Sequence, residues 1–108
     1  QDDTRELNVL WANLPGIEKN LINTPSIENL NSYKNHIKSI LDKILEKNVK
    51  LETARRRNRD DQKILVTIKI IDDKLQLLAK TIISGNNTAF DILKRTQDIR
   101  GLILDFKD

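Results

Sequence analysis

Two apolar stripes at helical spacing constrain the fold of this chain more than any other feature. Apolar side chains recur every three or four residues, first over residues 64–82 and again over residues 92–106. The stripes comprise Ile64, Ile68, Ile71, Leu75, Leu78 and Ile82, then Ile92, Thr96, Ile99, Ile103 and Phe106. An α-helix has about 3.6 residues per turn, so this alternation gathers each set on one helical face. Each face needs another element to cover it, which predicts a packed, all-α protein.

Residues 65–71 allow a second interpretation, because their β-branched side chains also favour strands. The helical register nevertheless continues unbroken to Ile82, and the sequence holds no second strand-like segment that could pair with this one. We therefore expect a helix over this stretch.

Turn residues mark the ends of the expected helices in the first half of the chain. Pro15-Gly16 is expected to stop a first helix, because proline lacks the N–H that the next hydrogen bond requires. Thr24-Pro25 resembles a helix start, with Thr24 as N-cap and proline in the first helical position. Residues 52–62 contain a single apolar side chain, so we expect a connection or an exposed tip there.

Similar signals place the last turn. Gly85 is expected to end a helix in the left-handed conformation, and Thr88 with Asp91 resembles a capping box that begins the final helix. We predict a single domain over residues 1–108, folded as a multihelical bundle or array of four to five helices with the N-terminal segment packed across the rest. Three of the helices are expected to be long and antiparallel, at about 25–51, 61–84 and 88–106.

Composition excludes several classes of protein. The chain of 108 residues has no cysteine, which excludes disulfides, zinc–cysteine sites and thiol chemistry. No apolar run approaches the roughly 20 residues that span a bilayer, and the polar N-terminus has no signal-peptide core. We therefore expect a cytoplasmic protein. Because the sequence does not begin with methionine, we expect the chain to begin partway through a longer protein.

The titratable residues do not form a recognisable catalytic or metal site. His36 is the only histidine, and no cysteine or second histidine accompanies it. The carboxylates of Asp60-Asp61 and Asp72-Asp73 are neighbours in sequence, so on a helix each pair diverges by about 100°. We expect no enzyme activity, no cofactor and no metal.

The net charge of +3 is concentrated in the middle of the chain, over residues 34–59. It peaks in an arginine cluster, Arg55, Arg56, Arg57 and Arg59, which could bind phosphates or another anionic partner. Three interpretations stay open: a solvated tip between helices, a docking site for an acidic protein, or a site for nucleic acid or an anionic membrane. The cluster has no interleaved aromatic residue and no nucleic-acid-binding motif around it, and Asp60-Asp61 follows at once.

Some residues imply contacts beyond the main stripes. Val66, Ile70, Leu77 and Ile83 are apolar but lie off the first stripe, so that helix must be central in the bundle or shared with a partner. Gly101 falls inside the final helix, where glycine costs about 1 kcal/mol relative to alanine. We expect another helix to pack closely against it.

Several collinear motifs resemble the YaaR-like family, small helical bacterial proteins of unknown function. They are Leu30-Asn31-Ser32-Tyr33-Lys34, the arginine-rich junction, the segment from Ile70 to Ala79, and Ile99-Arg100-Gly101-Leu102-Ile103-Leu104-Asp105. The most specific is the last, through Arg100, Gly101, Leu102 and Asp105. The resemblance implies an all-α fold, a bacterial, cytoplasmic setting and a further polar segment before Gln1, and it supplies no catalytic residue or ligand.

These observations favour a non-enzymatic interaction or adaptor module that binds another protein or forms a homodimer. The alternative is a nucleic-acid-associated protein that binds phosphates through Arg55, Arg56, Arg57 and Arg59, together with Lys47 and Lys50.

Overall fold

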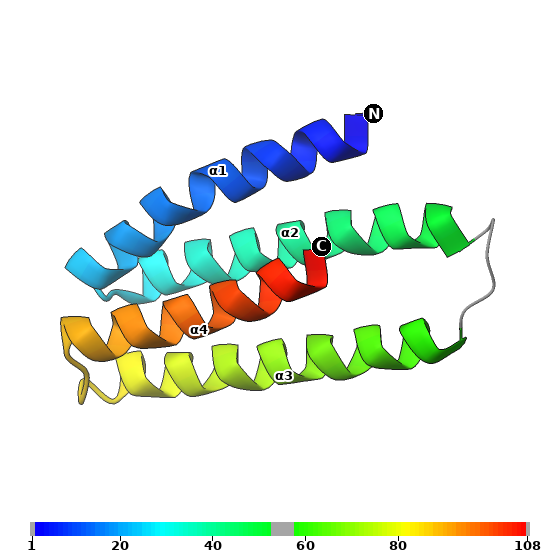
Figure 1. Ribbon diagram of the computed structural model, residues 1–108. Helices are drawn as coiled ribbons and strands as arrows, with labels where there is room; N and C mark the ends of the chain where they lie inside the picture. Colours follow the sequence, from blue (N-terminus) through cyan, green and yellow to red (C-terminus); the bar gives the residue numbers. More distant parts are fainter. Residues whose placement is uncertain (1, 53–57, 108) are drawn as a thin grey trace.

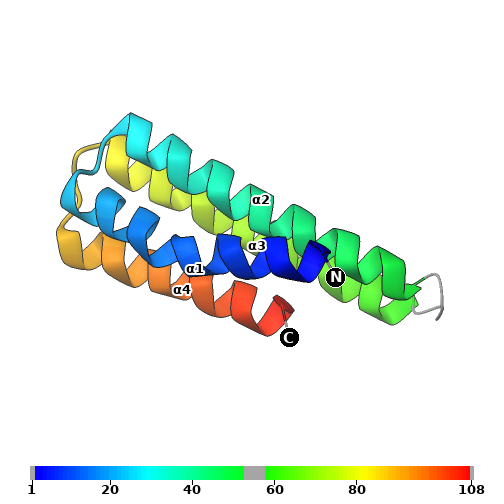
Figure 2. The same ribbon diagram turned by 90° about the horizontal axis from the view of Figure 1, so that it is seen from above.

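The computed structural model describes the backbone of residues 2–52 and 58–107, and the side chains of residues 5–47 and 63–107. The described chain forms four α-helices: α1 (Asp2–Asn23), α2 (Ile27–Glu52), α3 (Asn58–Ile83) and α4 (Ala89–Lys107). Successive helices run in opposite directions and lie side by side in one bundle (Figure 1 and Figure 2). The prediction of an all-α multihelical bundle is therefore confirmed, with four helices over the described residues.

The bundle is built from two helical hairpins. The most extensive contacts join α1 to α2 and α3 to α4, while α1 also packs on α4 and α2 on α3. The helices α2 and α3 extend past the ends of α1 and α4, so the bundle narrows to two helices at that end (Figure 1). The three predicted long helices are present, each with ends within a few residues of those expected.

The prediction that the first helix stops at Pro15-Gly16 is wrong. One continuous helix, α1, runs through Pro15 to Asn23 and lies alongside α2 and α4. The helix continues because residues before and after the proline, Leu14 and Leu21, are buried in the same core. Pro15 itself faces solvent, where water can hydrogen-bond the carbonyl group that loses its helical partner.

The predicted start of the second helix at Thr24-Pro25 is also displaced. The helix α2 begins at Ile27, and its N-cap is Ser26, whose Oγ accepts a hydrogen bond of 3.1 Å from the backbone N–H of Asn29. The side-chain amide of Asn29 in turn donates to the carbonyl oxygens of Asn20 and Thr24. This network fixes the turn between α1 and α2. Thr24 takes part in it through its backbone carbonyl oxygen, which accepts a hydrogen bond, and not through its hydroxyl.

The turn between α3 and α4 follows the prediction. Gly85 has a φ of +75°, in the left-handed region where glycine carries no Cβ penalty. Thr88 Oγ1 accepts a hydrogen bond of 3.1 Å from the backbone N–H of Asp91, so Thr88 caps α4 as expected.

The core runs along the bundle axis and contains the predicted stripes. Ile71, Leu75, Leu78 and Ile82 of α3 are buried, as are Ile92, Thr96, Ile99 and Ile103 of α4. Ile64 and Ile68 of the first stripe are half-buried. They belong to the N-terminal part of α3, towards the end of the bundle where α2 and α3 continue past α1 and α4 (Figure 1). Aliphatic side chains from α1 and α2, with Tyr33, complete the core.

Candidate interaction surface

The arginine cluster falls largely outside the described residues. Arg55, Arg56 and Arg57 lie outside the described residues, between the end of α2 and the start of α3. Arg59 lies in the first turn of α3, among residues whose side chains are not described. Whether the four arginines form a binding site stays a prediction.

Arg100, from the most specific sequence motif, forms an ion pair between α4 and α1. Its Nε donates a hydrogen bond of 3.1 Å to Oε2 of Glu18, and its second guanidinium nitrogen donates to Oε1. The Glu18 residue is only 3% exposed. A buried carboxylate is costly unless it is paired and hydrogen-bonded, and the two parallel bonds from one guanidinium meet that need. The role of Arg100 is therefore to join two helices.

Glu18 was missed by the sequence analysis, although a signal was available. It lies four residues after Leu14 and three before Leu21, so it occupies a position on the buried face of α1. A charge at such a position predicts a buried partner, and only the assumed break at Pro15-Gly16 concealed it.

The other motif residues have different environments. Leu102 is half-buried and packs against the core, while Asp105 faces solvent. The expectation of a closely packed helix at Gly101 is wrong within this chain. Gly101 is exposed, and apart from its own helix backbone and chain neighbours no described atom lies within 4 Å of where a Cβ would stand.

The polar groups near the core serve packing. His36 Nε2 lies 2.7 Å from the backbone carbonyl oxygen of Leu10, which joins α2 to α1. The hydroxyl of Tyr33 is buried and has no hydrogen-bond partner among the described atoms, and burial raises the pKa of this phenol. Where the structure describes side chains, it shows no group of three histidine or carboxylate residues placed to hold a metal ion.

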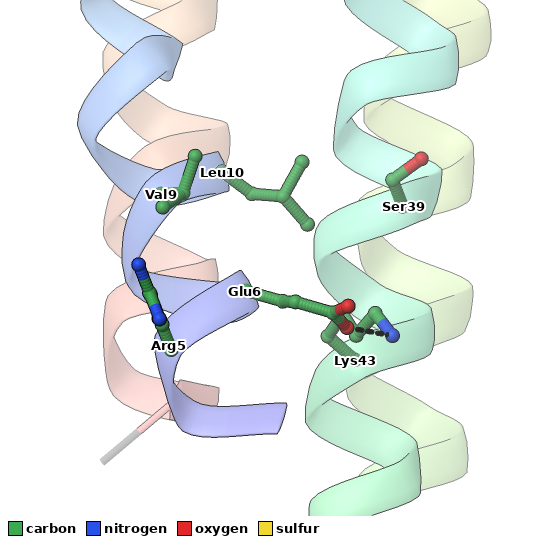
Figure 3. Close-up of a pocket in the computed structure, with 6 residues that line it drawn as sticks. All are labelled: Arg5, Glu6, Val9, Leu10, Ser39 and Lys43. Atoms are coloured by element: carbon green, nitrogen blue, oxygen red, sulfur yellow. Dashed lines mark ion pairs between the residues drawn. The ribbon is translucent and has the colours of Figure 1, made fainter. Parts of the chain in front are cut away.

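An open hollow of about 630 Å³ lies on the surface between α1 and α2 (Figure 3). It is lined by Arg5, Glu6, Val9, Leu10, Ser39 and Lys43. Within it, Glu6 reaches from α1 to form an ion pair with Lys43 on α2. The side-chain hydrogen bond with Glu6 is the largest of the causes that raise the pKa of Lys43 above its ordinary value. Two of the polar side chains that line this hollow, Glu6 and Lys43, are therefore paired with each other.

Exposed apolar side chains are unevenly distributed over the four helices. Of the ten large hydrophobic residues that are exposed among the described side chains, eight lie on α3 and α4. Of the two alternatives for α3, a central helix and one shared with a partner, the first is excluded, because Val66, Ile70, Leu77 and Ile83 are all exposed. Val66, Ile70 and Leu77 recur at helical spacing and lie on one side of α3. We call these three residues the α3 stripe.

A second stripe lies on α4 and faces a different direction. It comprises Phe90, Leu93, Gln97, Gly101 and Leu104, all exposed, and we call it the α4 stripe. At about 100° per residue, its centre falls between Arg100, which contacts α1, and Asp98, which contacts Lys74 of α3 at 2.6 Å. The ion pair between Lys74 and Asp98 therefore separates the two stripes.

Comparison with known proteins places this bundle in a family. Residues 1–107 match the sequence profile of the family described as protein of unknown function (DUF327). The chain belongs to this family. The resemblance to the YaaR-like proteins is thereby confirmed. No match was found among curated proteins.

The fold is shared with a solved bacterial structure. The crystal structure of an uncharacterized protein from Bacillus halodurans is similar with a TM-score of 0.86 at 28% sequence identity, over 99% of this chain and 88% of the other. None of the described helices is long and apolar enough to cross a membrane.

Proposed function

We propose that this DUF327 protein is a non-enzymatic protein-interaction module, and that the α3 stripe is the surface that binds another protein. The observation that supports the proposal is the concentration of exposed hydrophobic side chains on α3 and α4. Contiguous exposed apolar surface is uncommon on monomeric proteins and marks interaction sites. We further propose that the protein acts in the bacterial cytoplasm.

The geometry of the α3 stripe suits a helical or extended partner. Val66 is 58% exposed, Leu77 is 48% exposed and Ile70 lies between them, so the stripe follows the helix for about three turns. Taking one such side chain from full exposure to full burial contributes about 1.5–3 kcal/mol. These three are already about half buried, so the stripe supplies only part of the free energy that a specific contact needs. One charged residue interrupts the stripe: Asp73 lies between Ile70 and Leu77 on the same side of α3 and forms an exposed ion pair with Lys69 at 2.9 Å.

Two stripes on separate faces suit an adaptor. A protein that joins two others needs two surfaces that can be occupied at once, and the ion pair of Lys74 with Asp98 keeps the α3 stripe and the α4 stripe apart. We therefore propose that the α3 stripe binds the partner protein, while the α4 stripe has a different occupant.

The test is comparative capture from a bacterial lysate with the immobilised 108-residue chain. One variant replaces Val66, Ile70 and Leu77 with glutamine, a good helix former, so the fold should be retained. A control replaces Val9 and Ile27 with glutamine; these hydrophobic residues on α1 and α2 are 53% and 61% exposed. We expect to find proteins that both the wild type and the control retain. The α3 variant should retain at least about tenfold less of these proteins. Equal retention by all three chains would contradict the proposal.

Nucleic acid is the alternative ligand. The helices that flank the arginine cluster, α2 and α3, project beyond α1 and α4 (Figure 1). Fluorescence anisotropy with labelled DNA and RNA tests it, at low and near-physiological salt. Binding that falls steeply with salt and is lost when Arg55, Arg56, Arg57 and Arg59 become glutamate would favour this function.

A further inference from the structure

We propose that the α4 stripe binds a second copy of this chain, with the two α4 helices antiparallel and crossing near Gly101. The inference rests on the proposed function, because it names the occupant of the second apolar stripe. Three features of the described residues support it. They are an exposed glycine in the middle of a helix, apolar residues on either side of it, and charged residues placed so that each faces an opposite charge on the second copy.

Gly101 has no packing role inside its own chain. It costs the helix about 1 kcal/mol relative to alanine, yet a Cβ there would meet no neighbour outside its own helix. Glycine lets another backbone approach closely, since it has no side chain to hold that backbone away. Its position in the α4 stripe makes the open side of the glycine part of the proposed contact.

The stripe is self-complementary in an antiparallel arrangement. When two copies of α4 are related by a two-fold axis between Gln97 and Gly101, each Gln97 opposes the partner copy's glycine. Leu93 then meets Leu104 of the other copy, because the two leucines lie at nearly equal distances from the axis. In a two-fold interface the same surface patch of each copy contacts that of the other, so the patch must be complementary to itself.

The charges beside the stripe agree with the same register. Lys94 and Asp105 are exposed and lie on the same flank of α4, the side that faces α3. In an antiparallel pair equal flanks meet, so Lys94 of each copy faces Asp105 of the other, with opposite charges at both ends of the contact. On the opposite flank, Arg100 lies near the axis with its charge already balanced by Glu18.

The size of the contact sets its strength. One helix face per chain is small beside the roughly 800 Å² per partner of standard interfaces, so the dimer should be weak and reversible. Sedimentation equilibrium of the 108-residue chain, up to about 1 mM, covers the corresponding range of dissociation constants.

A charge-reversal cycle tests the register. Lys94→Glu and Asp105→Lys each place like charges opposite one another, and each should weaken the dimer about tenfold. The double variant should recover wild-type affinity, and a mixture of the two single variants should form a heterodimer. Lys80→Glu, an exposed charge reversal on α3, is the matched control and should leave the dimer unchanged. Thermal unfolding checks that each of the four variants folds.

A Gly101→Ala variant provides an independent test. It should stabilise the monomer, because no neighbour resists the added methyl group, and it should still weaken the dimer by holding the helices apart. A wild-type chain that stays monomeric at about 1 mM would overturn the proposal. So would a dimer that the charge reversals leave unchanged or that the double variant fails to restore. The capture experiment changes no α4 residue, so its outcome reports on the proposed function separately.

Discussion

Replacing Arg100 with alanine would leave the carboxylate of Glu18 buried without its partner. The Glu18 side chain is 3% exposed, whereas that of Arg100 is 39% exposed, so water can solvate the guanidinium more easily than the carboxylate. Removing one partner of a buried ion pair costs about 3–5 kcal/mol, whereas losing a hydrogen bond to a charged group costs about 1.5–3 kcal/mol. We therefore expect Arg100→Ala to lower the free energy of unfolding by about 3–4 kcal/mol, and Glu18→Gln, which leaves no buried charge, by about 2 kcal/mol.

Urea denaturation followed by circular dichroism measures both losses. Domains of this size have a free energy of unfolding of about 5–15 kcal/mol, so Arg100→Ala should shift the midpoint clearly while leaving a folded chain. Lys74→Ala is the matched control, because it breaks the exposed pair with Asp98 and should cost at most about 1 kcal/mol. Replacing both Glu18 and Arg100 with leucine should recover most of the loss.

The reasoning would be refuted by either of two results. If Arg100→Ala cost no more than Lys74→Ala, the Glu18 carboxylate would not depend on its partner. If Glu18→Gln were more destabilising than Arg100→Ala, the assignment of the carboxylate as the buried member of the pair would be wrong.

Three further predictions concern α1 and α2. Pro15→Ala should raise the free energy of unfolding by about 1–3 kcal/mol in urea denaturation, because it restores a helical hydrogen bond within α1; a loss would contradict the continuous helix. Ser26→Ala should lower it by about 1 kcal/mol while Thr24→Ala changes it little, and the reverse order would place the cap at Thr24. Tyr33→Phe should be neutral or stabilising at pH 7, because it removes a buried hydroxyl without a partner among the described atoms. Above about pH 10 the wild type should lose stability, since burial raises the pKa of Tyr33 above its value in the unfolded chain. Unfolding measured from pH 7 to 11 should show a smaller loss in the Tyr33→Phe variant.

The fold was largely predictable from the periodicity of its apolar residues. The stripes on α3 and α4 gave the positions of both helices and most of their core side chains, and Gly85 and Thr88 marked the turn between them. Such features depend on neighbours in sequence, and a helix is a local structure. The errors arose where tertiary contacts overrode a local signal, as at Pro15, where burial of Leu14 and Leu21 keeps the helix continuous.

The candidate surface was less predictable, because it depends on which residues the bundle leaves uncovered. The sequence identified Val66, Ile70 and Leu77 as off the main stripe but could not decide between a central helix and an exposed one. The open side of Gly101 was likewise invisible, since its environment depends on where α1 and α3 lie around α4. The direction in which a residue points from its helix can be calculated from the sequence. Which other helix lies in that direction cannot.

The even number of antiparallel helices brings both ends of the described chain, in α1 and α4, to the same end of the bundle (Figure 1). A short linker between them would therefore be compatible with the fold, and new ends could be opened in the turn at residues 84–88. Circular permutation would then convert α4–α1 from a contact between distant segments into a covalent hairpin. In such a chain the Glu18–Arg100 pair would join neighbouring helices, and the order in which the two halves of the bundle assemble could be reversed without altering any buried residue.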